Sequence, residues 1–190
     1  MTSLTFKDSL KGYQDSDFFK TLEINRGIER ESLRVNQQGQ ISQSEHPKGL
    51  GSPLTNPDIT TDFAEALVEL VTPTFSSAEG LFNHLSDLHH FLYSTMGDEI
   101  LWNFSMPCAF NSPEEIRIAE YGSSNSGMLK HVYRKGLSLR YGSIMQCVSG
   151  IHFNFSVSKN SWLAIESNPT QEFVSEKYLG LIRNVKRNSW

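Results

Sequence analysis

Alternation of polar and apolar side chains predicts a β-strand over residues 27–35. Glu29 and Glu31 would share one face of that strand, and the same face continues with Leu33 and Val35. Two acids spaced in this way lie roughly 7 Å apart, too far to share a proton but well placed to hold hard cations. A solvated edge strand is the alternative. The two apolar residues argue against it, because they draw the acid face toward a core, where unpaired carboxylates are costly.

A second strand is predicted over residues 66–72, where β-branched side chains precede a proline. Glu69 would then lie between Leu67 and Val71 on an otherwise apolar face. A buried acid in a strand needs a partner. A cation shared with the first two acids is one solution, and a distant arginine is the other.

Residues 143–158 are predicted to form one long strand with two unlike faces. The polar face carries Gln146, His152 and Asn154, and Gly150 removes bulk beside His152. We interpret this face as a binding surface, the alternative being a sheet face that simply meets water. The opposite face is expected to be core and consists of Met145, Cys147, Ser149, Ile151, Phe153, Phe155 and Val157.

Apolar residues at helical spacing predict several helices. They are expected from a cap at Ser76 to Gly97, from a cap at Ser112 to Gly122, over 128–141 with Val132, Leu137 and Tyr141 inward, and from a cap at Thr170 to Trp190. The last helix reaches the final residue without a glycine or proline stop, so the chain is expected to be cut rather than finished.

Composition excludes some classes of function. The 190 residues carry a net charge of −4 and no long cluster of Lys and Arg, which leaves nucleic-acid binding without an electrostatic basis. Residues 1–7 lack an export signal, and no segment is apolar enough to span a membrane. Cys108 and Cys147 show no metal-ligand spacing, so reduced thiols in a cytoplasm are expected.

Short motifs occur together along the chain, and as a set they closely resemble the N-terminal part of the bacterial glutamate–cysteine ligases of the proteobacterial type. The resemblance covers roughly residues 25–190. The motifs are Glu29-Arg30-Glu31, Thr60-Thr61-Asp62-Phe63-Ala64-Glu65-Ala66, Glu69, Met96-Gly97-Asp98-Glu99, Ser105-Met106-Pro107-Cys108, Ala119-Glu120-Tyr121-Gly122 and Ser149-Gly150-Ile151-His152-Phe153-Asn154-Phe155-Ser156.

The resemblance implies an α+β, glutamine-synthetase-like fold, in which a curved antiparallel sheet with flanking helices forms a cradle for the substrates. Residues 1–190 would be the N-terminal portion of a single catalytic domain, truncated at its C-terminus. The implied activity is the ATP-dependent ligation of the γ-carboxyl of glutamate to cysteine through a γ-glutamyl phosphate, which is the first step of glutathione biosynthesis.

The resemblance also implies roles for particular residues. Mg²⁺, with Mn²⁺ as a substitute, would be held by Glu29, Glu31, Asp62, Glu69 and His152, and no catalytic residue is expected beyond these metal ligands. Tyr133, Leu137 and Gln146 would line the cysteine pocket, and Asn154 would contact the nucleotide. Glutamate, cysteine and ATP are the expected partners of a cytoplasmic monomer that binds neither nucleic acid nor membrane.

Two alternatives remain open at the level of sequence. The first is a related carboxylate–amine ligase that uses another acceptor amine. The second is a metal-binding fragment that is catalytically inert. An assay of ADP release that requires both glutamate and cysteine separates the enzyme from the inert fragment, and replacement of cysteine by other amines separates the two ligases.

Overall fold

The computed structural model describes residues 6–189, and it divides the chain into two compact units. The sheet unit comprises residues 26–154, and the helical unit combines residues up to 25 with residues from 155 onward. Two parts of the chain lie outside the described residues. They are residues 1–5, which belong to the segment expected to lack an export signal, and Trp190, the expected end of the last helix. Within residues 6–189, no helix has both the length and the apolar character needed to cross a membrane.

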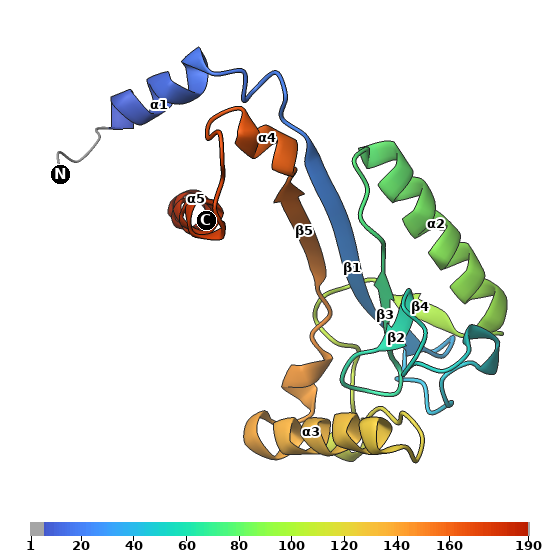
Figure 1. Ribbon diagram of the computed structural model, residues 1–190. Coiled ribbons are helices and arrows are strands. Elements are labelled where there is room, and N and C mark those ends of the chain that lie inside the picture. Colours follow the sequence, from blue (N-terminus) through green and yellow to red (C-terminus); the bar gives the residue numbers. More distant parts are fainter. Residues whose placement is uncertain (1–5, 190) are drawn as a thin grey trace. The chain divides into compact units, whose positions relative to one another are not determined.

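A five-stranded sheet forms the framework of the fold (Figure 1). Its strand order is β2-β3-β1-β4, with antiparallel neighbours along this path, and β5 also pairs with β1. The two strands predicted around the acids are confirmed. The strands are β1 (Ile24–Val35), β2 (Ile59–Thr61), β3 (Leu67–Val71), β4 (Ile100–Trp102) and β5 (Ile151–Val157).

The register of β1 against β3 confirms the predicted alternation. Glu31 lies opposite Glu69, and Leu33 lies opposite Leu67. Leu33 and Val35 are fully buried. The face that carries the acids therefore continues directly into a hydrophobic core, whose buried members are Leu33, Val35, Ile41, Phe63, Ala64, Ala66, Leu67, Cys108, Ile116 and Cys147.

The opposite face of the sheet is covered by α2 (Ala78–Thr95), which runs alongside the strands in Figure 1. The helix is capped by Ser77, one residue after the predicted cap, and its side chain accepts the N–H of Gly80. Gly97, with a φ of 63°, follows the helix end as predicted. Each large side chain buried here stabilises the fold by roughly 1.5–3 kcal/mol. This second hydrophobic core, under α2, consists of Leu50, Ile59, Val68, Leu70, Leu88, Leu92, Met96 and Leu101.

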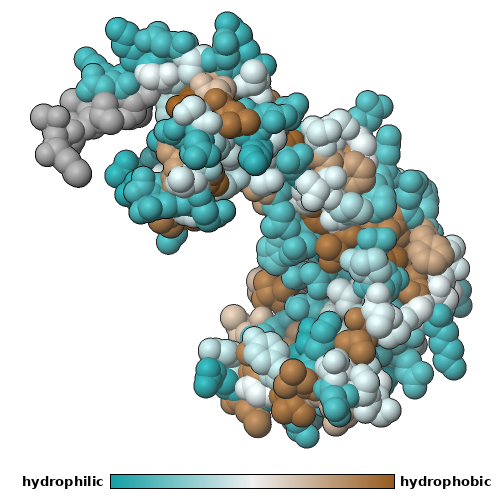
Figure 2. Space-filling model, viewed as in Figure 1, coloured by the Kyte–Doolittle hydropathy of each residue, from teal (hydrophilic) through white to brown (hydrophobic). Residues whose placement is uncertain are grey.

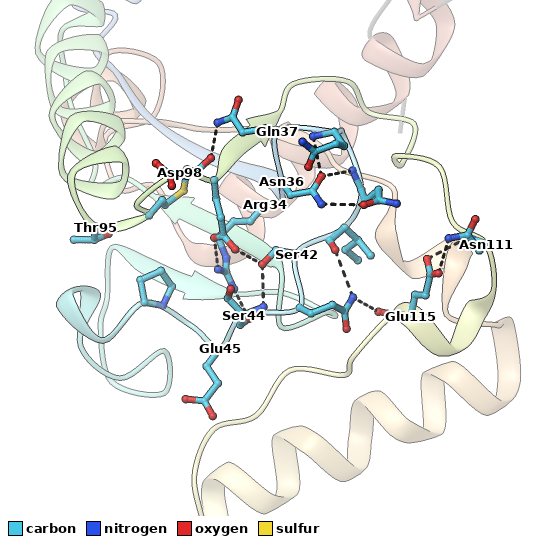
Figure 3. Close-up of a pocket in the computed structure, with 17 residues that line it drawn as sticks. Arg34, Asn36, Gln37, Ser42, Ser44, Glu45, Thr95, Asp98, Asn111 and Glu115 are labelled. Carbon is cyan, nitrogen blue, oxygen red and sulfur yellow. Dashed lines mark hydrogen bonds and ion pairs between the residues drawn. The ribbon is translucent and has the colours of Figure 1, made fainter.

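Arg34 lies on the α2 side of β1 and is almost completely buried. Its guanidinium donates to Glu99 Oε2 at 2.6 Å and to the carbonyl oxygens of Ser44 and Glu65 at 3.1 Å each. A polar cavity of about 780 Å³ opens beside this ion pair, and Figure 3 shows Arg34, Ser42 and Ser44 on its wall. Because Arg34 and the acids occupy alternate positions of β1, this cavity is on the other side of the sheet from them.

The predicted helix over residues 112–122 is wrong. Only Pro113–Glu115 form a 3-10 turn, and the backbone then becomes extended. Ile118 forms a bridge with Ala64, and the N–H of Ala119 donates to the carbonyl of Phe63 at 3.0 Å. Pairing with a distant segment thus outweighs the local helix signal.

The predicted strand over residues 143–158 is wrong in its first half. Ile144–Cys147 form a 3-10 helix, and β5 begins only at Ile151. Gln146 therefore does not share a strand face with His152. The expected core face is confirmed for Cys147 and Ser149, which are buried. It is wrong for four other members, which are exposed in the described chain: Met145, Ile151, Phe153 and Phe155.

Helix α3 (Asn125–Tyr141) begins at a Ser124 cap and ends at Gly142, whose φ of 82° terminates it as predicted. Leu137 packs against the core on the acid side. The prediction that Val132 and Tyr141 face inward is wrong, because both are more than half exposed. Figure 2 shows brown hydrophobic side chains over this helix, which contributes exposed Met128, Leu129, Val132 and Leu139.

In the helical unit, Trp162 is the centre of an aromatic cluster with Phe18, Phe173 and Tyr178. The cap predicted at Thr170 is confirmed, since its hydroxyl accepts the N–H of Phe173 at 3.2 Å. The helices of this unit are α1 (Phe6–Asp15), α4 (Lys159–Leu163) and α5 (Gln171–Asn188).

Candidate active site

Glu31 and Glu69 face each other across β1 and β3. The backbone N–H of Glu31 donates to the carbonyl of Gly150 on the opposite edge of β1, at 3.0 Å. Glu31 and Glu69 are therefore a non-hydrogen-bonded pair, the kind in which the side chains of an antiparallel ladder come closest. Like charges in directly opposite positions destabilise a sheet, so this pairing needs a compensating group.

The electrostatics of Glu69 show that negative charge accumulates here. Partial burial and the neighbouring carboxylates of Asp62, Glu31 and Glu29 raise the pKa of Glu69 to about 7. The His152 imidazole opposes this shift. Among the described residues, no arginine contributes to the pKa shift of Glu69, so the distant arginine partner considered from the sequence is not found.

Strand β5 supplies the groups that contact the two acids of β1. The N–H of Gly150, just before the strand, donates to Glu31 Oε2 at 2.7 Å. His152 Nδ1 lies 3.2 Å from Glu29 Oε2 and 3.9 Å from Glu31 Oε1. The amide Nδ2 of Asn154 donates to Glu29 Oε1 at 2.8 Å. The predicted polar face of this strand therefore contacts the acids of β1, while His152 and Asn154 themselves are exposed.

Asp62 follows β2 directly and lies near the other acids, since its charge contributes to the pKa shift of Glu69. Burial raises the pKa of Asp62, and the positive charge of Arg134 acts in the opposite direction. Its backbone carbonyl accepts hydrogen bonds from Arg134 Nε and from the Tyr121 hydroxyl, the latter at 3.1 Å. Tyr121 also donates to the carbonyl of Thr61 at 2.7 Å.

These side chains fit a divalent cation by their chemistry. Carboxylate oxygens are the ligands that Mg²⁺ prefers, and a neutral imidazole suits Mn²⁺ as well. Burial is the larger cause of the raised pKa of Glu69, and the charges of the neighbouring acids add to it, so the acids also repel one another. Within residues 6–189, however, no three His, Cys, Asp or Glu side chains are already grouped tightly enough to hold an ion. Binding would therefore require small rearrangements of these side chains.

The residues expected to line the cysteine pocket lie on neighbouring elements. Tyr133 and Leu137 are four residues apart on α3 and so share one face of the helix. Gln146 is half-buried in the 3-10 helix that follows, and Ser138 and Ser143 join the two helices by a hydroxyl contact of 2.8 Å. Tyr133 is 62% exposed.

Sequence reasoning missed the groups that support the site. Tyr121 lies under two cationic side chains, with Lys130 Nζ 4.9 Å and Arg134 Cζ 4.7 Å from its ring centre. Glu65 is buried, and its carboxylate accepts the backbone N–H groups of His46 and Glu120 at 2.8 Å each. The Ala119-Glu120-Tyr121 motif was the available signal, but nothing in the sequence pattern indicated its partner.

Comparison with known proteins identifies the family. The family model "Glutamate-cysteine ligase" matches residues 9–190. Curated glutamate–cysteine ligases from Hahella chejuensis and Pseudomonas putida are 51% and 50% identical over 174 and 169 residues. These alignments cover 88% and 86% of this chain but 33% and 32% of the relatives. The chain therefore spans about a third of the length of these proteins.

Two solved structures resemble the fold. A glutamate–cysteine ligase from Francisella tularensis, in complex with AMP, has a TM-score of 0.72 at 50% identity and covers 74% of this chain and 28% of its own. A bifunctional glutathione synthetase from Pasteurella multocida has a TM-score of 0.71 at 31% identity and covers 85% of this chain and 20% of its own. The predicted α+β fold with an antiparallel sheet is thus confirmed, and the chain belongs to the glutamate–cysteine ligase family.

Proposed function

We propose that the protein containing this chain joins the γ-carboxyl of glutamate to the amine of cysteine, with ATP as co-substrate, as the first step of glutathione biosynthesis. Family membership supports the reaction, and the AMP bound to the Francisella neighbour supports a nucleotide site. The observation that carries the proposal is the pairing of Glu31 opposite Glu69 beside Asp62 and Glu29, a concentration of negative charge that a structural surface has no reason to keep.

The chemistry requires two steps. An oxygen of the glutamate γ-carboxylate attacks the terminal phosphorus of ATP, the bond to ADP breaks, and an acyl phosphate forms. The cysteine nitrogen then attacks the acyl carbon, the carbon–oxygen bond to phosphate breaks, and the nitrogen loses a proton. Both steps bring anions together, so charge neutralisation and orientation are the main demands on the site.

We assign the holding of Mg²⁺, or Mn²⁺ in its place, to Glu29, Glu31, Asp62, Glu69 and His152. When bound, such a cation offsets the charge on phosphate oxygens. His152 lies within 4 Å of both acids of β1, which supports its membership of the set. Asn154 is assigned to the nucleotide, and its hydrogen bond to Glu29 supports a contact beside the acids.

We assign the cysteine pocket to Tyr133, Leu137 and Gln146, supported by the shared face of the first two on α3. Residues 1–190 would form one portion of a single catalytic domain. A cytoplasmic location is part of the proposal, and two free, buried cysteines whose thiol pKa values are raised by burial support it. The monomeric state stays a prediction.

The proposal is tested with Glu29→Gln in the full-length natural protein. The substitution keeps the shape of the side chain and removes its charge, so we expect ADP release that depends on both glutamate and cysteine to be lost. Glu23→Gln, at an exposed glutamate earlier in the chain, is the matched control and should retain activity.

Near-normal turnover of Glu29→Gln at saturating Mg²⁺ would remove Glu29 from the site. Activity of the wild-type protein with other amines but not with cysteine would favour the related ligase. The absence of any ADP release with either class of amine would leave a metal-binding protein without this activity.

A further inference from the structure

Gly150 is held to Glu31 by two reciprocal hydrogen bonds. Its N–H donates to the carboxylate Oε2 of Glu31 at 2.7 Å, and its carbonyl accepts the backbone N–H of Glu31 at 3.0 Å. The first bond is charge-assisted and among the stronger kinds. The residue that carries one acid of the proposed site is thus fixed through both its backbone and its side chain.

The segment around Gly150 is itself anchored. Cys147 is fully buried in the core on the acid side, and Ser149, 5% exposed, donates its N–H to the carbonyl of Ser105 at 2.9 Å. These contacts fix the direction in which the N–H of Gly150 points. The donor to Glu31 is therefore preorganised rather than recruited when a ligand arrives.

An added side chain at this position would meet a limit of space rather than of backbone conformation. Gly150 is not among the glycines with a positive φ, so other residues fit its backbone. A Cβ added at Gly150 would lie 3.2 Å from His152 Nε2 and 3.5 Å from Glu31 Oε2. The first distance is too short for normal contact, so the imidazole would have to move by a few tenths of an ångström.

We propose that Gly150 is a positioning residue of the site: its lack of a side chain leaves the space in which the His152 ring stands against Glu29 and Glu31, beside a backbone N–H that holds the Glu31 carboxylate. This inference rests on the proposed metal site. Groups that orient metal ligands typically change metal affinity by 10–100-fold when they are lost.

The test measures how tightly the full-length Gly150→Ala protein binds Mn²⁺, first without and then with ATP. Electron paramagnetic resonance gives the concentration of free Mn²⁺. We expect the affinity to fall at least tenfold, while the melting temperature in EDTA stays within about 2 °C because the substitution changes little buried surface. Gly12→Ala, where an added Cβ meets nothing within 4 Å, is the matched control and should bind as the wild type does.

A double-mutant cycle with His152→Ala separates positioning from a general structural role. If the added methyl acts by displacing the imidazole, Gly150→Ala should lower the Mn²⁺ affinity by less than about threefold when His152 is already alanine. Unchanged Mn²⁺ affinity of Gly150→Ala, or an equal loss in both backgrounds, would overturn the role of Gly150. Wild-type protein that binds no Mn²⁺ under either condition would instead refute the proposed metal site, and the positioning role with it.

Discussion

Replacing Glu69 by Gln should stabilise the metal-free protein at neutral and higher pH while it weakens the proposed site. Glu69 lies opposite Glu31, and partial burial with three nearby carboxylates raises its pKa from 4.5 to about 7. Glu69→Gln keeps the shape of the side chain without the charge. The substitution therefore removes the cost of burying a charged carboxylate, together with the repulsion from the neighbouring acids, which the fold carries when no cation is bound.

The size and the pH window of the effect follow from linkage. At about 1.4 kcal/mol per pKa unit, the shift corresponds to at most about 3.5 kcal/mol. Partial exposure of Glu69 reduces the expected value to about 1–2 kcal/mol. Between pH 4.5 and about 7 the native state binds a proton that the unfolded state has lost. Wild-type stability therefore falls as pH rises through that window, whereas the amide in the Glu69→Gln variant does not titrate.

The assay compares thermal unfolding of the wild type and Glu69→Gln in EDTA at pH 4.5, 6 and 8. The gain should be near zero at the lowest pH and reach its full size at pH 8, a rise of roughly 2–8 °C for a chain of this size. The exposed Glu176→Gln is the control and should change stability by less than about 0.5 kcal/mol at every pH.

At saturating Mg²⁺ the wild type should become more stable than Glu69→Gln. A ligand that binds only the native state stabilises the protein that binds it more tightly, and the wild type keeps the carboxylate of the proposed site. A Glu69→Gln protein that is no more stable than the wild type at pH 8 without metal would refute the reasoning. It would show that neither burial nor the neighbouring carboxylates disfavour the charged form of Glu69 in the folded protein.

Two further predictions concern the residues that support the site. Glu99→Ala should lower the free energy of unfolding, measured by chemical denaturation, by about 3 kcal/mol, because it leaves the buried guanidinium of Arg34 without its carboxylate. The double change Arg34→Met with Glu99→Leu should recover most of this loss. A loss below about 1 kcal/mol for Glu99→Ala would contradict the prediction. Tyr121→Phe should lower the free energy of unfolding by about 1 kcal/mol and weaken Mn²⁺ binding severalfold, because it removes the hydroxyl that donates to the carbonyls of Thr61 and Asp62. Tyr93→Phe, at an exposed tyrosine, is the control. Unchanged Mn²⁺ affinity of Tyr121→Phe would separate Tyr121 from the site.

The acid face was predictable because alternation in β1 depends only on strand geometry. Glu29 and Glu31 share a face with Leu33 wherever the strand sits. The position of Glu69 directly opposite Glu31 was not predictable, since register depends on which residues pair across the sheet. The sequence placed Glu69 in apolar company and offered either a cation or an arginine as its partner.

The errors share a physical cause, which is that a local pattern does not state its long-range partners. Residues 112–122 carry helix signals, yet Ile118 pairs with Ala64 and the segment is extended. Alternation in β5 correctly grouped Ile151 with Phe153, but it could not say what covers that face, and both are exposed in the described chain. Arg134 and Tyr121 were missed for the same reason, because their contact with Asp62 joins segments far apart in sequence.

The two-sided character of β1 limits which changes in chain length evolution can accept. Because side chains alternate, deleting one residue between Glu31 and Arg34 would place the charged Arg34 on the same face as the acids, against the buried core. It would also remove the partner of Glu99 from the other face. Changes of length in the loop between Leu50 and Ile59 do not alter which face of β1 each side chain points to. We therefore expect insertions and deletions to be tolerated in that loop and to be excluded from β1, whatever residue they add or remove.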